Sequence, residues 1–226
     1  MKQSVTRVTQ QLAIELAFLV SSSAWAGSSP NAGQAPFLLS ALIVDNSAAG
    51  PVELDLAKEK ATATFRGAGI DVEWRHFSTS TGAPSAPARD ASGRDVLPLT
   101  LILPAKKAYP ALKKLFGLPK SAMGFAKTRP ADKPYGDTAY IFVNRVEELI
   151  RGDAFARLGV VLGHIIAHEL GHLLLGRGHT SSGLMGAQVG ARTLKLARAN
   201  RLHFSRSQAR KILAVVGRRT SSRRAD

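Results

Sequence analysis

The sequence predicts an α+β domain in which a twisted, mixed β-sheet packs on two main helices. Three observations support this fold class. Short apolar segments with strand patterns dominate the chain up to about residue 143, one early segment over 51–66 has helical spacing, and helical patterns fill the chain from about residue 153 onward. Strands with one early helix, followed by further helices, are typical of α+β domains.

The first strand and the first helix are separated by a short turn. Residues 37–44 form an apolar run that ends at the turn pair Asp45-Asn46, which predicts a buried strand. Pro51 is suited to opening a helix, and Gly67 ends it after Arg66. The apolar residues of this segment share one helical face: Leu54, Ala57, Ala61 and Phe65.

Four more strands are predicted in the middle of the chain. Each is marked by alternation or by a continuous apolar run, and Gly124 suggests that one of them lies at a sheet edge. A short basic helix over 109–116 and polar loops over 78–95 and 128–137 separate the strands. The strands cover 70–74, 97–103, 122–126 and 138–143.

Helices dominate the last third of the chain. Asp153 is a candidate N-cap for a long helix that runs to Leu175, and the glycines of 176–178 end it. A loop rich in Gly and Ser extends to Gly190. The final helix follows Ser205 and has one apolar face: Ala209, Ile212, Leu213 and Val216.

The N-terminal segment has the features of a signal peptide. A basic start and an apolar stretch over 12–20 precede Ala24-Trp25-Ala26, which fits a small-residue cleavage site. We therefore expect a signal peptide over 1–26, a domain over 27–217, and a basic disordered tail over 218–226. The expected product is secreted, either extracellular or periplasmic, and does not insert stably into a membrane. The alternative for the first residues is a short amphipathic helix.

Charge and cysteine content narrow the possible chemistry. The chain has no cysteine, which excludes thiol nucleophiles, disulfides and zinc sites built on cysteine. Its formal net charge is +15, and Asp226 is the sole acid after His172. An acidic surface or polymer is a possible partner for this basic region, although a solvated basic face explains the same pattern.

Four of the six histidines fall between residues 164 and 179. In a helix, His168 and His172 lie one turn apart and point the same way, which suits two nitrogen ligands of one zinc ion. Glu169 is offset by about 100° and can face a water beside the metal. Since His-Glu-x-x-His combines two ligands and a general base, the segment predicts a zinc site with Glu169 as the catalytic group.

A catalytic zinc site needs a third protein ligand. An acidic ligand after His172 is excluded, because no Asp or Glu occurs before Asp226. The histidine candidates are His179, His203 and His164. His179 is favoured, because the preceding glycines allow the chain to turn back toward the metal. His164 lies one turn before His168 and is better suited to packing or to supporting a ligand.

The segment 168–185 resembles the active-site region of the metzincin zinc proteases, especially the matrixin-like group. The resemblance rests on His168-Glu169-Leu170-Gly171-His172, Gly176-Arg177-Gly178-His179 and Ser182-Gly183-Leu184-Met185. It implies that His168, His172 and His179 bind zinc, that Glu169 is the general base, and that Met185 lies in a turn beneath the metal. One departure is that three residues, and not two, separate His172 from Gly176.

These features predict one function and leave two alternatives. We expect a monomeric zinc metalloendopeptidase that acts on protein or peptide substrates, with an extended peptide added to the edge strand near Ala122–Ala126. Tyr135 or Tyr140 is a candidate for stabilising the oxyanion. The alternatives are a catalytically silent, zinc-stabilised binding module and a basic protein that binds nucleic acid or another anionic polymer. Few aromatic residues accompany the C-terminal charges, which argues against base stacking.

Overall fold

The computed structural model describes residues 37–77, 87, 89–128, 137–187 and 189–222. The chain divides into two units, residues 1–34 and 35–226, and the first unit lies outside the described residues. The predicted signal peptide, most of the loop over 78–95 and Tyr135 therefore also lie outside them.

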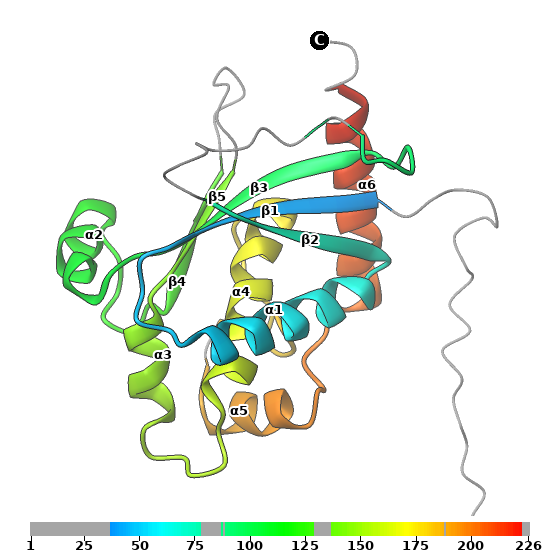
Figure 1. The fold of residues 1–226 in the computed structure, drawn as a ribbon. Coiled ribbons are helices and arrows are strands. Elements are labelled where there is room, and N and C mark those ends of the chain that lie inside the picture. The colour runs from blue at the N-terminus through cyan, green and yellow to red at the C-terminus, as the bar shows by residue number, and fades with distance from the viewer. Residues whose placement is uncertain (1–36, 78–86, 88, 129–136, 188, 223–226) are drawn as a thin grey trace, which may run out of the picture. The chain divides into compact units, whose positions relative to one another are not determined.

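A five-stranded mixed sheet forms one layer of the second unit (Figure 1). Its spatial order is β2-β1-β3-β5-β4. The pairs β1–β2, β1–β3 and β3–β5 are parallel, whereas β4 runs antiparallel to β5. The strands are β1 (Phe37–Asp45), β2 (Ile70–His76), β3 (Val96–Leu103), β4 (Gly124–Lys127) and β5 (Thr138–Ile141). The α+β prediction is confirmed, and so is the position of β4 at an edge.

Two helices pack closely against each other and contribute much of the core: α1 (Pro51–Arg66) and α4 (Leu158–Leu175). Glycines in α4 make this approach possible. A Cβ atom on Gly163 would lie 2.5 Å from the carbonyl oxygen of Ala57, and one on Gly159 would lie 2.6 Å from that of Glu53. The backbone N–H of Gly159 also donates to the Glu53 carboxylate. Contacts this close require residues without a side chain.

The start of the long helix differs from the prediction. It begins at Leu158 and not near Asp153, and a separate helix, α3 (Val143–Ile150), precedes it. Asp153 caps no helix, because its carboxylate accepts hydrogen bonds from Arg198 at 2.7 and 3.0 Å and from the N–H of Phe155 at 3.0 Å. Val143, expected in a strand, is the first residue of α3.

The two C-terminal helices are α5 (Ala191–Arg198) and α6 (Arg206–Ser222). The tail expected over 218–226 is therefore wrong for its first five residues, which belong to α6. Two contacts explain why the helix continues. Thr220 is buried and its hydroxyl donates to the carbonyl of Val216, while Arg219 pairs with the carboxylate of Asp137.

The helix expected over 109–116 is present as α2 (Tyr109–Phe116), preceded by the 3-10 turn η1 (Lys106–Ala108). Gly117 ends α2 with a φ of 61°, a conformation that glycine adopts readily. Phe116 packs on Phe125 of β4, with ring centroids 4.5 Å apart, and Phe125 stacks on Tyr140 of β5 at the same distance. These rings attach α2 to the sheet edge.

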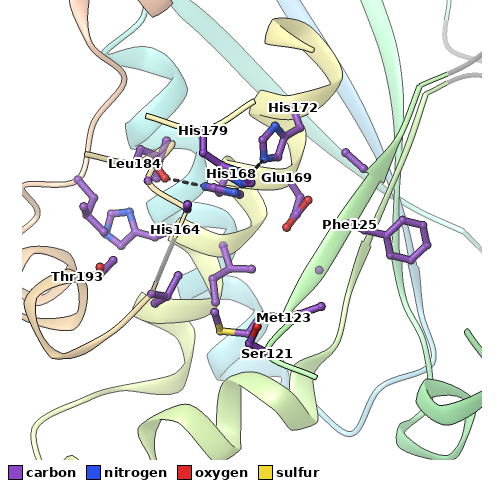
Figure 2. A pocket seen from close by; sticks show the side chains of 18 of the residues that line it. Ser121, Met123, Phe125, His164, His168, Glu169, His172, His179, Leu184 and Thr193 are labelled. Atoms are coloured by element: carbon purple, nitrogen blue, oxygen red, sulfur yellow. Dashed lines mark hydrogen bonds between the residues drawn. The ribbon is translucent and has the colours of Figure 1, made fainter. Parts of the chain in front are cut away.

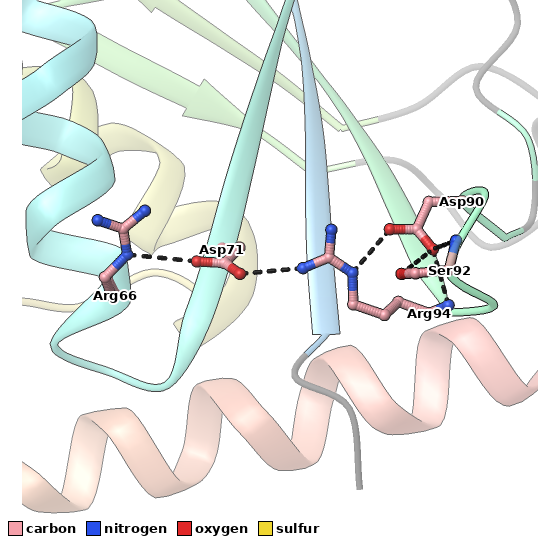
Figure 3. Close-up of polar contacts among 5 residues, drawn as sticks. All are labelled: Arg66, Asp71, Asp90, Ser92 and Arg94. Atoms are coloured by element: carbon pink, nitrogen blue, oxygen red, sulfur yellow. Dashed lines mark hydrogen bonds and ion pairs between the residues drawn. The ribbon is translucent and has the colours of Figure 1, made fainter.

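A chain of charged groups connects the end of α1, the start of β2 and the turn before β3 (Figure 3). Asp71 lies between Arg66, at 3.4 Å, and Arg94, at 3.0 Å. Arg94 also binds Asp90 at 2.7 Å. Hydrogen bonds from Ser92 and from Arg94 lower the pKa of Asp90 to about 2. These ion pairs hold the turn before β3 in place.

Candidate metal centre

The candidate metal centre is built on the middle of α4, where His168 and His172 lie one turn apart. Their Nε2 atoms are 3.0 Å from each other. The helix is apolar enough to cross a membrane by length and composition, yet 72% of it is buried inside the protein. That burial is typical of a core helix, and it holds both imidazoles on a rigid element.

His179 reaches the same point from the loop after α4. The helix ends at Leu175, and Gly176 and Gly178 follow with φ of 85° and 135°. These backbone angles favour glycine and turn the chain back. The Nε2 atom of His179 consequently lies 3.2 Å from that of His172. The loop therefore accommodates the additional residue between His172 and Gly176.

The three histidines form a donor set that could hold a metal ion, with ligand atoms all within 4.8 Å of one another. The Nδ1 atom of His168 lies 2.7 Å from the carbonyl of Leu184, and that of His172 lies 3.1 Å from the carbonyl of Gly176. A carbonyl only accepts, so each Nδ1 carries the hydrogen and each Nε2 keeps its lone pair.

The spacing of the Nε2 atoms fits one zinc ion. Two nitrogens bound to a tetrahedral zinc at ~2.0–2.1 Å lie about 3.3 Å apart, close to the 3.0 and 3.2 Å separations found here. Burial lowers the pKa of His168 to about 4 and also lowers the pKa of His172, so both rings are neutral near pH 7. Neutral lone pairs that converge at this distance repel unless a cation lies between them.

Met185 packs against α4 at Gly171, the residue before His172. It is 1% exposed, and a Cβ atom on Gly171 would lie 2.9 Å from its sulfur and 2.9 Å from Phe204. Gly171 thus leaves the space that Met185 and Phe204 occupy. Because the carbonyl of the preceding residue, Leu184, accepts the hydrogen bond from His168, the same turn orients one candidate ligand.

Glu169 lies beside the histidines and faces strand β4 (Figure 2). Its side chain is 7% exposed, and burial raises the pKa of its carboxyl group to about 8. A Cβ atom on Gly124 would lie 2.8 Å from Cγ and 2.9 Å from Oε1 of Glu169. In the sequence, Gly124 suggested the edge of a sheet. Nothing in the sequence indicated that it contacts Glu169.

A cavity of about 520 Å³ opens onto these groups. Its walls come from α4, from the segment 118–126 that leads into β4, from α5 and from the loop around Leu184. The segment 122–126, expected from the sequence to lie beside the substrate, lines this cavity, whereas the sequence did not indicate that 118–121 and α5 line it. Candidate metal ligands, a buried carboxyl group and a cavity with apolar walls therefore meet at one place.

Three other sequence candidates do not join the cluster of His168, His172 and His179. His164 and His203 are not among the three clustered histidines. Tyr140 stacks on Phe125, whose ring lies across β4 from Glu169 (Figure 2). Tyr140 therefore does not line the cavity, and the suggestion that it stabilises an oxyanion there is wrong: its side chain points to the other face of the sheet.

No protein-family model and no curated protein matches the chain. Among solved structures, it is similar to metalloproteinase-II from Bacteroides fragilis, at 14% identity and a TM-score of 0.43, over 82% of this chain and 55% of that one. It is also similar to archaemetzincin from Methanopyrus kandleri, at 16% identity and a TM-score of 0.42, over 80% of this chain and 96% of that one. The chain thus spans little more than half of the Bacteroides protein.

Proposed function

We propose that the protein is a zinc-dependent metallopeptidase in which His168, His172 and His179 hold the metal and Glu169 is the general base. The observation that carries this proposal is the convergence of three histidine Nε2 atoms, at 3.0 and 3.2 Å, beside a buried carboxyl group in an open cavity. Three nitrogen ligands with an accessible fourth position are typical of catalytic zinc.

Each residue has a defined part in this reaction. Bound zinc would supply an activated water and polarise the scissile carbonyl. Glu169, whose ionised form the charge of a bound zinc ion would favour, accepts a proton from the attacking water and passes it to the leaving amine. The carbonyls of Leu184 and Gly176 hold the imidazoles of His168 and His172 in the tautomer that binds metal.

Strand β4 is the proposed site for the substrate backbone. It is the terminal strand of the sheet, and it faces Glu169 through Gly124. An extended peptide can add to such an edge through main-chain hydrogen bonds. Its scissile bond would then lie between β4 and the three histidines.

The test is a digest of casein and of a peptide library with zinc-loaded protein, with and without a chelator. We expect cleavage that the chelator stops and that added zinc restores. Glu169→Gln should reduce cleavage by at least about 100-fold, because it removes the proton acceptor, while zinc content stays unchanged. Arg210→Gln, at an exposed position of α6 outside the cavity, is the control and should cleave normally. If Glu169→Gln cleaves as fast as the parent, the mechanism is wrong.

A second candidate is a zinc-stabilised binding module without catalytic activity. The longer spacing between His172 and Gly176 favours it, because His179 approaches from a loop that differs from the metzincin pattern. Zinc bound at a 1:1 ratio with no cleavage of any library peptide would support this alternative. Loss of zinc in His179→Ala would show that His179 binds the metal, whether or not the protein is catalytic.

We further propose that the protein is exported, with cleavage after Ala26, and that it acts as a monomer. The proposal rests on the basic start, the apolar stretch and Ala24-Trp25-Ala26. N-terminal sequencing of the exported product should begin near Gly27. An intact Met1 terminus on the mature protein would refute processing at this site.

A further inference from the structure

Arg177 lines the cavity and has no part in the proposed reaction. It lies in the loop that leads from α4 to His179, and it is exposed. Among the residues that the structure describes, none forms an ion pair with it. The chain that follows has no acid before Asp226. Because arginine is charged at any ordinary pH, the loop presents a positive charge that the described part of the protein does not offset.

The loop determines where this charge lies. Nδ1 of His172 is 3.1 Å from the carbonyl oxygen of Gly176, immediately before Arg177, and His179 joins the histidine cluster two residues after it. Two residues of extended chain span at most about 7 Å, so the backbone of Arg177 lies within that distance of the backbone of His179. A group bound by Arg177 would therefore lie within a few residues of the scissile bond of a bound peptide.

Arg177 also lines a second, smaller hollow of about 260 Å³ between the loop and the start of α6. Lys211 lines this hollow as well, and its Nζ atom donates to the carbonyl of Leu175 at 3.1 Å. No acid is found among the described residues around the hollow. The ammonium group of Lys211 repels a second cation, so the hollow offers the guanidinium group no favourable partner.

The main cavity differs in what it would attract. Glu169 is the one acid among its described lining residues, and Arg177 offsets that single negative charge. A bound zinc ion held by neutral imidazoles would add two positive charges. The loaded cavity would then carry a net positive charge, which favours the entry of an anionic group.

We propose that Arg177 binds a carboxylate group of the substrate within a few residues of the scissile bond, and that the enzyme thereby selects acidic peptides. A guanidinium group can form two parallel hydrogen bonds to a carboxylate. The carboxylate belongs either to an Asp or Glu side chain or to the C-terminus of a peptide. The term substrate rests on the proposed peptidase function, whereas binding of the carboxylate can be measured without turnover.

Peptide binding to the full-length, zinc-loaded Glu169→Gln variant tests the inference. One set of probes is a blocked hexapeptide of alanine in which a single position, moved along the peptide, is either Glu or Gln. A second set has no acidic side chain and carries either a free or an amidated C-terminus. The ratio of the two dissociation constants within a pair gives the preference for a carboxylate. The set that shows a preference identifies the source of the carboxylate.

Two substitutions in the Glu169→Gln background separate Arg177 from the general charge of the protein. Arg177→Gln should reduce the preference at least about fivefold, because it removes the charged hydrogen-bond donor. Arg210→Gln removes the same charge from an exposed position of α6 outside the cavity and should leave the preference unchanged. Added salt should weaken the preference where Arg177 is present, since it screens exposed charges. Circular dichroism and zinc content establish that each variant is folded and loaded.

Three binding results overturn the inference. The first is the absence of any preference for a carboxylate, or of any peptide binding, in the Glu169→Gln background. The second is a preference that persists in Arg177→Gln, because the carboxylate would then bind the zinc ion itself. The third is an equal loss in Arg177→Gln and Arg210→Gln, because the preference would then reflect the charge of the whole protein.

The peptide digest distinguishes this inference from the proposed function. The parent should cleave near acidic residues or near a free C-terminus more often than Arg177→Gln does. Cleavage by both proteins with the same site preference overturns the inference alone. A binding preference that depends on Arg177, without cleavage of any peptide, supports the inference and refutes the peptidase proposal.

Discussion

Gly124 and Glu169 face each other at the mouth of the cavity, and the space between them depends on the missing side chain of Gly124. A Cβ atom there would lie 2.9 Å from Oε1 of Glu169 and 2.7 Å from the carbonyl of Tyr140. Gly124 is therefore a positioning residue for the proposed base. Because Gly124 has no side chain, the backbone of β4 can pass close to the carboxyl group of Glu169.

We expect Gly124→Ala to displace the carboxyl group of Glu169 and to lower kcat by at least about 10-fold, since a small misplacement of a reacting group is costly. The matched control is Gly152→Ala, the same substitution at a position where nothing lies within 4 Å of the added Cβ atom. Steady-state kinetics with a cleavable peptide measure the effect. Equal kcat for Gly124→Ala and the parent, at equal zinc content, would contradict this role.

His164 provides a test by pH in the metal-free protein. Its pKa is lowered by burial from 6.5 to about 4, so between these values the unfolded state binds a proton that the folded state does not. The stability contributed by the neutral ring is therefore present above pH 6.5 and is lost as pH falls toward 4, at up to about 1.4 kcal/mol per pH unit.

Urea unfolding of the chelator-treated protein at pH 7, 6 and 5 measures this loss. His168 and His172 act in the same direction and Glu169, with its raised pKa, in the opposite one. These groups are common to the parent and to His164→Leu, so the difference between the two isolates His164. The free energy of unfolding should fall less steeply with acid in His164→Leu. Parallel pH profiles would exclude a buried neutral His164.

Among the helices, α1 and α4 depend on each other through glycines. Gly163→Ala should destabilise the protein by about 1–3 kcal/mol, because the new methyl group would lie 2.5 Å from the carbonyl of Ala57 and overpack the interface. Gly152→Ala is the control, since nothing lies within 4 Å of its added Cβ atom. Thermal and urea unfolding measure the stability of Gly163→Ala and of Gly152→Ala relative to the parent. A stability for Gly163→Ala equal to that of the control would show that the helices can separate without cost.

Elements with strong local signals could be predicted from the sequence. The helix bounded by Pro51 and Gly67 has the bounds that its flanking residues indicate, and the edge position of β4 follows from Gly124. The helix start expected at Asp153 could not be corrected locally, because the competing partner, Arg198, is 45 residues away in sequence. Similarly, the pairing of Arg219 with Asp137, which helps to extend α6, joins residues 82 apart.

The same distinction applies to the candidate centre. The i, i+4 spacing on α4 brings His168 and His172 together through helix geometry alone. The approach of His179 depends on the backbone angles of Gly176 and Gly178, which the sequence permits but does not specify. The full cavity could not be predicted, because 118–121 and α5 meet α4 only through tertiary packing.

For the molecule as a whole, a metal ion would join the core helix α4 to the loop that carries His179. The chain has no cysteine, so disulfides cannot contribute to its stability. Zinc at about 1,000 times its dissociation constant should stabilise the folded protein by about 4 kcal/mol. We expect Tm to rise with added zinc and to fall after chelation. His179→Ala should show a much smaller rise, whereas His203→Ala should respond as the parent does; a Tm insensitive to zinc in the parent would refute the site.

The apolar character of α4 has a consequence for biogenesis. If the chain is exported as proposed and crosses the membrane unfolded, the 18 residues of Leu158–Leu175, with a mean hydropathy of 1.5, are exposed during the crossing. Such a segment can leave the translocation channel sideways and stop there. Glu169, near its middle, opposes this, since a charged group at the centre of a bilayer costs about 3 kcal/mol. Variants such as Glu169→Leu would then risk becoming anchored in the membrane, a defect that appears in the location of the chain before any enzymatic assay.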